Sequence, residues 1–266
     1  ITIPTFYMDF AAYQKGEKNY RSTTRDVDQL LSELKDEDID TLILDLRSNG
    51  GGSLIEATNL AGLFIDHGPV VQVQDSSGNL EIHKDLKKGV SYDGPLVVLV
   101  DRFSASASEI VASALQDYGR AVVVGEATYG KGSVQQLIDL NRFSRSKEAK
   151  LGQLKATIAQ YFRVDGGSTQ HKGVLPDINY VEGIKVSERG ERSLKNALPW
   201  SQITPASYLG QVIARSVIDQ LDKQHLTRVA DNQRYQTMVK LFELNETLTD
   251  RKTVSLNETT RKKRFD

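Results

Sequence analysis

The chain has 266 residues, 39% of them hydrophobic and 26% charged, a composition typical of a globular protein with one large or two modest domains. Its 34 basic and 35 acidic residues leave a net charge of −1, which predicts neither a nucleic-acid partner nor a membrane surface. It has no cysteine, which excludes a thiol nucleophile, disulfides and cysteine-ligated metal sites, and no apolar run long enough to span a membrane.

The first part of the chain, residues 1 to about 182, alternates short apolar runs with helical periods, which predicts an α/β layer fold. Helices are expected from Ser22 or Thr23 to residue 34, over 54–64 and over 107–118. Strands are expected at 1–8, 41–46, 70–74, 80–83, 95–100, 121–125, 133–140 and 154–164.

The character of the sequence changes beyond residue 183. A polar, irregular stretch is followed by helical periods near 208–221 and 235–248. We therefore predict two units, a core over 1–182 and a C-terminal helical extension over 183–266. The chain opens at Ile1, inside a predicted strand, so we expect it to be a fragment of a longer protein that carries any targeting signal elsewhere.

The segment DRFSASASEI (101–110) lies where a buried strand passes into a helix. A serine at this junction projects its hydroxyl beyond the strand ends, and the helix N-terminus offers N–H groups to a developing oxyanion. Ser104, Ser106 and Ser108 are also ordinary candidates for a helix cap, and on this segment alone the cap is the favoured interpretation.

Two glycine-rich turns also follow strands, NGGG (49–52) and GEATYGKG (125–132). Gly51 or Gly52 can direct an N–H toward the same oxyanion, and burial of Lys131 would lower its pKa enough to make it a base. Tight turns and a solvated lysine are the plainer alternatives. The sequence has four histidines, and all lie outside these turns: His67, His83, His171 and His225. A Ser–His–Asp triad therefore has no histidine placed to serve as its base.

Taken together, these segments resemble the carboxyl-terminal processing peptidases, also called tail-specific proteases, of the Gram-negative periplasmic type. The central serine of SASASE precedes the lysine of GKG by 25 positions, which is a specific spacing. The resemblance covers most of the chain, through ITIPTFYMDF, DLRSNGGGSLIEA, GLFIDHGPVVQV, the stretch from LVVLVDRFSASASE to GKGSVQQ, and YFRVDGGSTQHKGVLPDI.

The resemblance implies a serine endopeptidase with a Ser–Lys catalytic pair. Ser106 matches the nucleophile, Lys131 the general base, and Gln135 a residue that orients the lysine in some members. Asp117 matches a position that is important without a settled role. The N–H groups of Ala107 and Gly51 match the oxyanion hole, and two further residues match positions of structural support: Glu109 and Arg47.

The same resemblance implies the spiral α/β core shared with crotonase and the Clp protease, followed by the helical extension. It further implies a helical region and a PDZ domain ahead of the core, a periplasmic location peripheral to the inner membrane, and neither cofactor nor metal. The expected partners are unfolded or C-terminally tagged proteins with apolar, disordered C-termini, and an adaptor lipoprotein.

Two alternatives remain open. One is a scaffold that keeps the fold without catalysis, against which the intact Ser106, Lys131 and Gln135 argue. The other is an acyl-CoA enzyme of the crotonase type, in which the GKG lysine would have no role.

Overall fold

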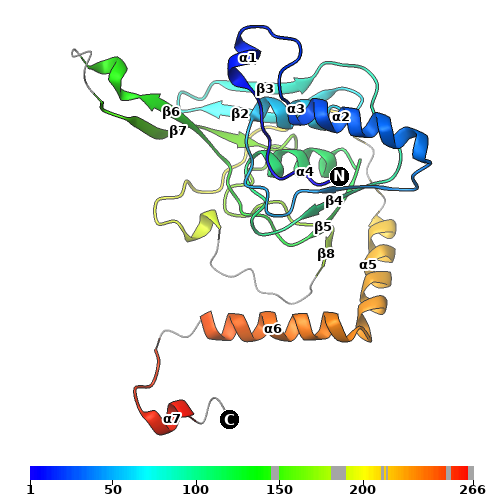
Figure 1. Ribbon diagram of the computed structural model, residues 1–266, viewed down its shortest axis with the longest axis vertical. Helices are drawn as coiled ribbons and strands as arrows, with labels where there is room; N and C mark the ends of the chain where they lie inside the picture. The colour runs from blue at the N-terminus through cyan, green and yellow to red at the C-terminus, as the bar shows by residue number, and fades with distance from the viewer. Residues whose placement is uncertain (145–149, 181–189, 211–212, 214, 250–252, 263–266) are drawn as a thin grey trace.

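The computed structural model describes residues 1–144, 150–180, 190–210, 213, 215–249 and 253–262. Its core contains two four-stranded sheets (Figure 1). The first is parallel, in the order β1 (Leu42–Asp45), β4 (Leu96–Val100), β5 (Val122–Gly125) and β8 (Ile178–Asn179). The second is antiparallel, in the order β3 (Leu80–Asp85), β2 (Gly68–Asp75), β7 (Gln153–Phe162) and β6 (Ser133–Asp139).

Helices fill the space between and beside the sheets. α4 (Ala107–Asp117) packs on α3 (Leu54–Ala61) and contacts both β2 and β5, so it joins the two layers (Figure 1). α2 (Thr23–Leu34) covers α3, and the side chains of Ser22 and Ser53 cap these two helices at their N-termini. The core is apolar and closed, with several side chains at 0% exposure: Leu44, Val98, Val111, Leu115 and Val123.

Parallel pairing decides where the functional loops meet. β4 lies between β1 and β5, with Leu44 beside Val98 and Val98 beside Val123. The carboxyl ends of these three strands therefore share one edge, where ligand sites of open parallel sheets usually lie. The loops that leave this edge are bonded together, since Ala105 N–H donates to Asn49 O at 3.0 Å and Tyr129 N–H donates to Ser104 O at 3.0 Å.

The first eight residues form isolated bridges rather than the predicted strand. Thr2 pairs with Asp45, and Phe6 pairs with Gly52. Pro4 lies between these bridges and has no N–H to continue a ladder, which explains the interruption. The bridge at Phe6 still holds the glycine turn, because Phe6 N–H donates to Gly51 O at 3.0 Å.

Short helices complete the described part of the core: α1 (Phe10–Gln14), η1 (Lys35–Glu37), η2 (Leu140–Phe143) and η3 (Glu191–Ser193). α1 and β8 were not predicted, because elements of five and two residues carry almost no periodic signal. The α/β class predicted from the sequence is confirmed.

The C-terminal region contains α5 (Arg215–Ala230), α6 (Gln233–Thr249) and α7 (Glu258–Lys262), which confirms the predicted helical extension (Figure 1). The helix predicted from 208 begins only at Arg215. The preceding segment is bonded to the core instead, with Tyr208 packed on Tyr118 at 5.0 Å between ring centroids and Ala206 N–H donating to Val164 O. The predicted boundary between 182 and 183 lies outside the described residues.

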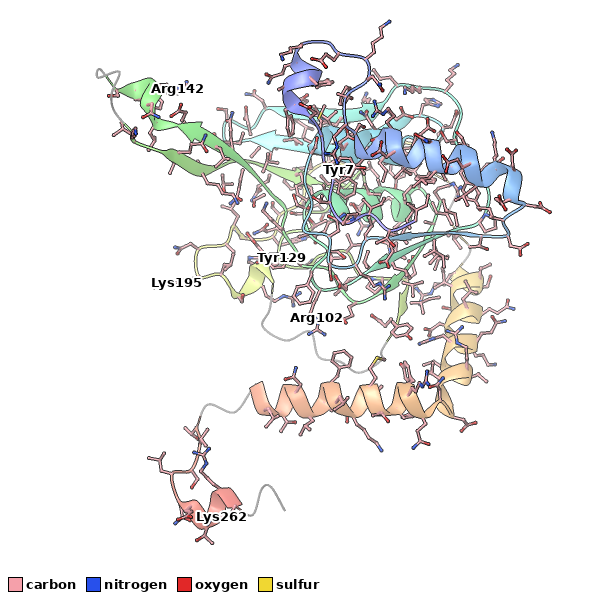
Figure 2. All side chains as sticks on the ribbon, viewed as in Figure 1. Tyr7, Arg102, Tyr129, Arg142, Lys195 and Lys262 are labelled. Atoms are coloured by element: carbon pink, nitrogen blue, oxygen red, sulfur yellow. The ribbon has the colours of Figure 1, made fainter. Side chains whose placement is uncertain are left out.

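The backbone carbonyl of Tyr180, just after β8, binds side chains of the helical extension. His225 of α5 lies 3.0 Å from Tyr180 O, and the Tyr235 hydroxyl of α6 donates to the same oxygen at 2.9 Å. Figure 2 shows Arg102 at the edge of the core that faces α6, where its guanidinium lies 5.8 Å from the centroid of the Phe242 ring. Among the described residues, no helix combines the length and apolarity needed to cross a bilayer.

Candidate active site

The loop between β4 and α4 presents three serines, and the structure separates them. The Ser104 hydroxyl donates to Leu46 O at 2.8 Å, and the Ser108 hydroxyl donates to Asn49 O at 2.8 Å. Both side chains are fully buried. Ser106 instead lines a cavity of about 180 Å³, together with residues of the glycine turn, α3, α4, the lysine loop, β6 and β7. Only Ser106 of the three is therefore available to a substrate.

The backbone at Ser106 is strained. Its φ of 57° and ψ of −111° lie in a region that residues with a side chain rarely adopt. Such strain persists where the surrounding structure holds it, and a strand–turn–helix with a strained serine at its apex exposes the hydroxyl. Here the Ser106 N–H donates to a carboxylate oxygen of Glu109, 2.8 Å away on the first turn of α4.

Lys131 lines the same cavity from the loop between β5 and β6. Burial of its amine lowers the pKa of Lys131, and the neighbouring cation of Lys155 lowers it further. The carboxylates of Glu191 and Glu109 act in the opposite direction on the same pKa. A half-buried amine whose pKa is lowered is suited to accept a proton near neutral pH.

The side chains of Ser106 and Lys131 share the cavity without a hydrogen bond between them in this structure. Catalytic hydrogen bonds are often long or unformed before substrate binds. Gln135, predicted to orient the lysine, also lines the cavity, at a β-bulge in β6.

The predicted oxyanion donors lie beside Ser106. Ala107 is the first residue of α4 and lines the cavity. A Cβ on Gly51 would fall 2.9 Å from Ser106 Cβ, so the glycine turn approaches the nucleophile closely. However, the Gly51 N–H donates to Asn49 Oδ1 at 2.8 Å, whereas Gly52 lines the cavity directly.

Asp117 does not join this site. It lies at the last turn of α4, eleven residues from Ser106, which corresponds to about 16 Å along a helix. Its carboxylate pairs with Arg163, whose Nε donates to Asp117 Oδ2 at 3.1 Å. The sequence motif includes both Ser106 and Asp117 because they lie at opposite ends of α4. Arg47 is likewise distant from the cavity and pairs with Asp45 at 2.6 Å.

Sequence reasoning missed the two cavity residues that β7 contributes. Lys155 and Tyr161 reach the site from β7, which is brought there by its pairing with β6. Neither has a local sequence signal. None of the four histidines lines this cavity, which agrees with the absence of a placed Ser–His–Asp triad.

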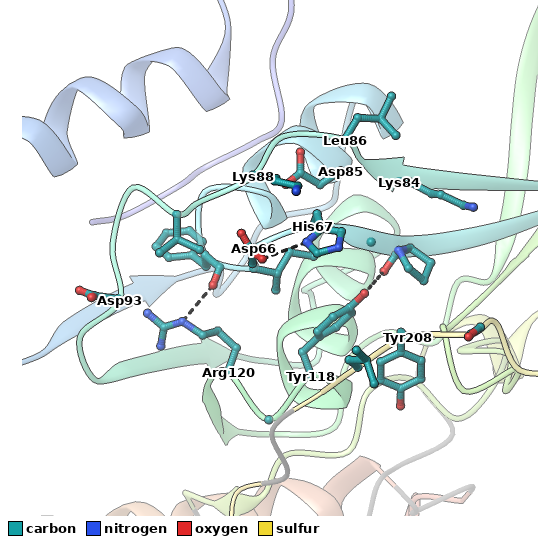
Figure 3. A pocket seen from close by; sticks show the side chains of 18 residues that line it. Asp66, His67, Lys84, Asp85, Leu86, Lys88, Asp93, Tyr118, Arg120 and Tyr208 are labelled. Atoms are coloured by element: carbon teal, nitrogen blue, oxygen red, sulfur yellow. Dashed lines mark hydrogen bonds and ion pairs between the residues drawn. The ribbon is translucent and has the colours of Figure 1, made fainter.

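A larger hollow, of about 810 Å³, lies near the C-terminal end of α4 (Figure 3). There the Tyr118 hydroxyl donates to Pro69 O at 2.9 Å and Arg120 donates to Phe64 O at 3.0 Å. Acidic and basic side chains both line it, among them Asp66, which lies 2.9 Å from His67 Nδ1.

The fold and the cavity define an α/β protein with a serine and a half-buried lysine at the edge of a parallel sheet, an arrangement expected of serine hydrolases. Comparison with known proteins narrows the class. The chain belongs to peptidase family S41, whose profile matches residues 1–180, and residues 184–266 match the C-terminal domain of tail specific protease.

Individual relatives agree with this assignment. The chain is 41% identical over 269 residues to the tail-specific protease of Haemophilus influenzae, covering all of this chain and 37% of that protein. It is 36% identical over 157 residues to the chloroplastic C-terminal processing peptidase of Tetradesmus obliquus, covering 59% of this chain and 32% of that protein. The chain thus spans about a third of the length of these relatives.

Solved structures share the fold of the core. The photosystem II D1 C-terminal processing protease superposes with a TM-score of 0.55 at 33% identity, covering 67% of this chain and 41% of that chain. Mature CPAF superposes with a TM-score of 0.52 at 16% identity, covering 67% of this chain and 46% of that chain, which supports the fold alone.

Proposed function

We propose that the protein is a serine endopeptidase in which Ser106 is the nucleophile and Lys131 the general base. The observation that carries this proposal is that one cavity contains the strained serine at the start of α4 and a half-buried lysine whose pKa is lowered by burial. Membership of peptidase family S41 supports the same reaction class.

The reaction is an acyl transfer. Ser106 Oγ attacks the carbonyl carbon of a peptide bond while neutral Lys131 takes the hydroxyl proton. The resulting ammonium then protonates the departing amine, which leaves an acyl ester on Ser106. Water attacks that ester, passes a proton to Lys131, and releases the new C-terminus as Ser106 recovers its proton.

The oxyanion is expected to be stabilised by backbone N–H groups. Ala107 supplies one from the N-terminus of α4, and the glycine turn supplies another. Gly51 can serve only after its N–H leaves Asn49 Oδ1, whereas Gly52 already lines the cavity. Each such donor contributes about 3 kcal/mol to lowering the barrier.

The proposed substrates are unfolded or C-terminally tagged proteins that are attacked from apolar, disordered C-termini. The names of the relatives, tail-specific and C-terminal processing, support attack at the C-terminus. A periplasmic location is proposed from the Gram-negative source of the Haemophilus relative. The adaptor lipoprotein stays a prediction.

The test is to measure cleavage of an unfolded protein with an apolar C-terminus by the wild-type protein and by its variants. Ser106→Ala and Lys131→Ala are each expected to lower kcat/KM by about 10⁴-fold or more. Ser108→Ala is the matched control, because its hydroxyl is buried two residues away and bonded to Asn49 O. It is expected to change stability and leave the rate within about threefold.

Retention of full activity by Ser106→Ala would exclude the proposed nucleophile. Binding of an acyl-CoA thioester without peptide cleavage would favour the crotonase-type reaction instead. If Lys131→Ala keeps wild-type activity while Ser106→Ala is inactive, Ser106 remains the proposed nucleophile and Lys131 is rejected as the base.

A further inference from the structure

A single buried carboxylate connects the nucleophile to the base. Glu109, on the first turn of α4, has 0% exposure. Its Oε2 accepts the N–H of Ser106 at 2.8 Å and the N–H of Lys131 at 3.0 Å. Its Oε1 accepts the Thr128 hydroxyl at 2.6 Å and the N–H of Gly130 at 2.7 Å. One oxygen atom therefore fixes the main chain of both reacting residues.

A tyrosine hydroxyl completes this arrangement. Tyr161 reaches in from β7, is 2% exposed, and donates to the carbonyl oxygen of Lys131. The same hydroxyl lies 3.3 Å from the carbonyl oxygen of Ser106 and 3.5 Å from Glu109 Oε2. The N–H groups of Ser106 and Lys131 thus meet the carboxylate, and their carbonyl groups meet the phenol.

We propose that Glu109 and Tyr161 are positioning residues that hold Ser106 and Lys131 in reacting geometry, and that the Glu109 carboxylate, bonded to the Lys131 N–H, also acts on the Lys131 amine through its charge. This inference rests on the proposed function. Neither residue touches the reacting atoms directly, so both act through the backbone of the pair.

The hydrogen bonds to Glu109 require its ionised form. A carboxylate has about four acceptor positions, and here four donors occupy them. Desolvation raises the pKa of Glu109 to about 7, while these donors counteract the rise. The bonds that organise the site are therefore lost as the pH falls through the pKa of Glu109.

The charge of Glu109 acts on Lys131 together with its other neighbours. Burial has the largest effect on the pKa of Lys131 and lowers it, and Lys155 from β7 lowers it further. Glu191 from η3 and then Glu109 from α4 raise it by smaller amounts. Removing the Glu109 charge must therefore lower the pKa of Lys131. The rising limb of activity with pH, which reports the neutral amine, would then move to lower pH.

Three substitutions in the wild-type protein separate the effect of the Glu109 charge from the effect of the placement of Ser106 and Lys131. Glu109→Gln removes the charge and places an amide among four donors. Glu109→Asp keeps the charge but shortens the reach by one methylene. Tyr161→Phe removes only the hydroxyl. The readouts are kcat and KM across pH, thermal unfolding, and the rate at which a fluorophosphonate labels Ser106.

The chain contains a matched control in Glu56. It is also fully buried at the third position of a helix, α3, and its Oε2 accepts the Ser22 hydroxyl at 2.8 Å and the Thr24 N–H at 2.7 Å. Glu56→Gln disturbs a buried carboxylate at the same helix position that bonds neither Ser106 nor Lys131. It is expected to lower stability and leave the pH limb and the labelling rate unchanged.

All three substitutions are expected to lower kcat about 100-fold with KM within about threefold, since small misplacements of reacting groups have effects of this size. Only Glu109→Gln is expected to move the limb to lower pH. Should Glu109→Gln fail to fold, the kcat of Glu109→Asp and of Tyr161→Phe decides the proposal.

The inference is overturned if Glu109→Asp and Tyr161→Phe retain wild-type kcat, or if Glu109→Gln loses activity with its pH limb unmoved. An active parent and an inactive Ser106→Ala variant establish the proposed function independently of these outcomes. A parent that is inactive and does not label at Ser106 would overturn both.

Discussion

Breaking the buried pair between Asp117 and Arg163 is expected to destabilise the core. The Asp117 side chain is 7% exposed and that of Arg163 is 18% exposed. Arg163 donates to both carboxylate oxygens. Asp117→Ala leaves the guanidinium buried without its carboxylate, and loss of one partner from such a pair typically costs about 3–5 kcal/mol.

That loss corresponds to a fall in Tm of about 6–20 °C for a domain of this size. The assay is thermal unfolding followed by circular dichroism, with activity measured at a temperature where the variant stays folded. Activity is also expected to fall, because Arg163 lies two residues from Tyr161 at the end of β7. Asp117 would thus affect the site through the strand, despite its distance from Ser106.

Asp165→Ala provides the control. This aspartate lies 3.9 Å from the same guanidinium but is 49% exposed, so its loss is expected to cost less than about 1 kcal/mol. The double variant Asp117→Leu with Arg163→Leu removes both charges and should recover most of the lost stability. Equal Tm values for the two single aspartate variants would refute the reasoning.

Two further predictions concern the cavity. Lys155→Ala removes a cation beside Lys131, so the pKa of Lys131 should rise and the limb of kcat/KM should move to higher pH, by less in high salt. Gly52→Ala places a Cβ 2.2 Å from Phe6 O at a φ of 148°, and should cost about 3 kcal/mol or more in thermal unfolding. Gly50→Ala meets nothing within 4 Å and should be close to neutral.

Each of these predictions has a clear contrary result. A pH limb that stays in place in Lys155→Ala would mean that its charge does not reach Lys131. A Gly52→Ala variant as stable as Gly50→Ala would mean that the turn and the Phe6 bridge can move apart without loss.

Short-range patterns in the sequence located most of the longer elements, and together with the family resemblance they located the candidate pair. The helices at 23–34 and 107–117 and the strands at 42–45 and 96–100 follow periodic apolar residues and capping serines. The strand–loop–helix junction singled out the serines, and the glycine-flanked lysine followed from its own loop. Local patterns act over a few residues, which is why they located these features.

Tertiary structure decided which of those residues meet. Parallel pairing of β1, β4 and β5 brings three loops to one edge, and hydrogen bonds bury Ser104 and Ser108 while Ser106 faces the cavity. Pairing of β6 with β7 brings Lys155 and Tyr161, which are 24 and 30 residues from Lys131 in the sequence, to the lysine loop, and α4 carries Asp117 away from it. These contacts join residues that are far apart in the sequence, and they depend on strand register and helix length. A pattern of a few neighbouring residues therefore does not predict them.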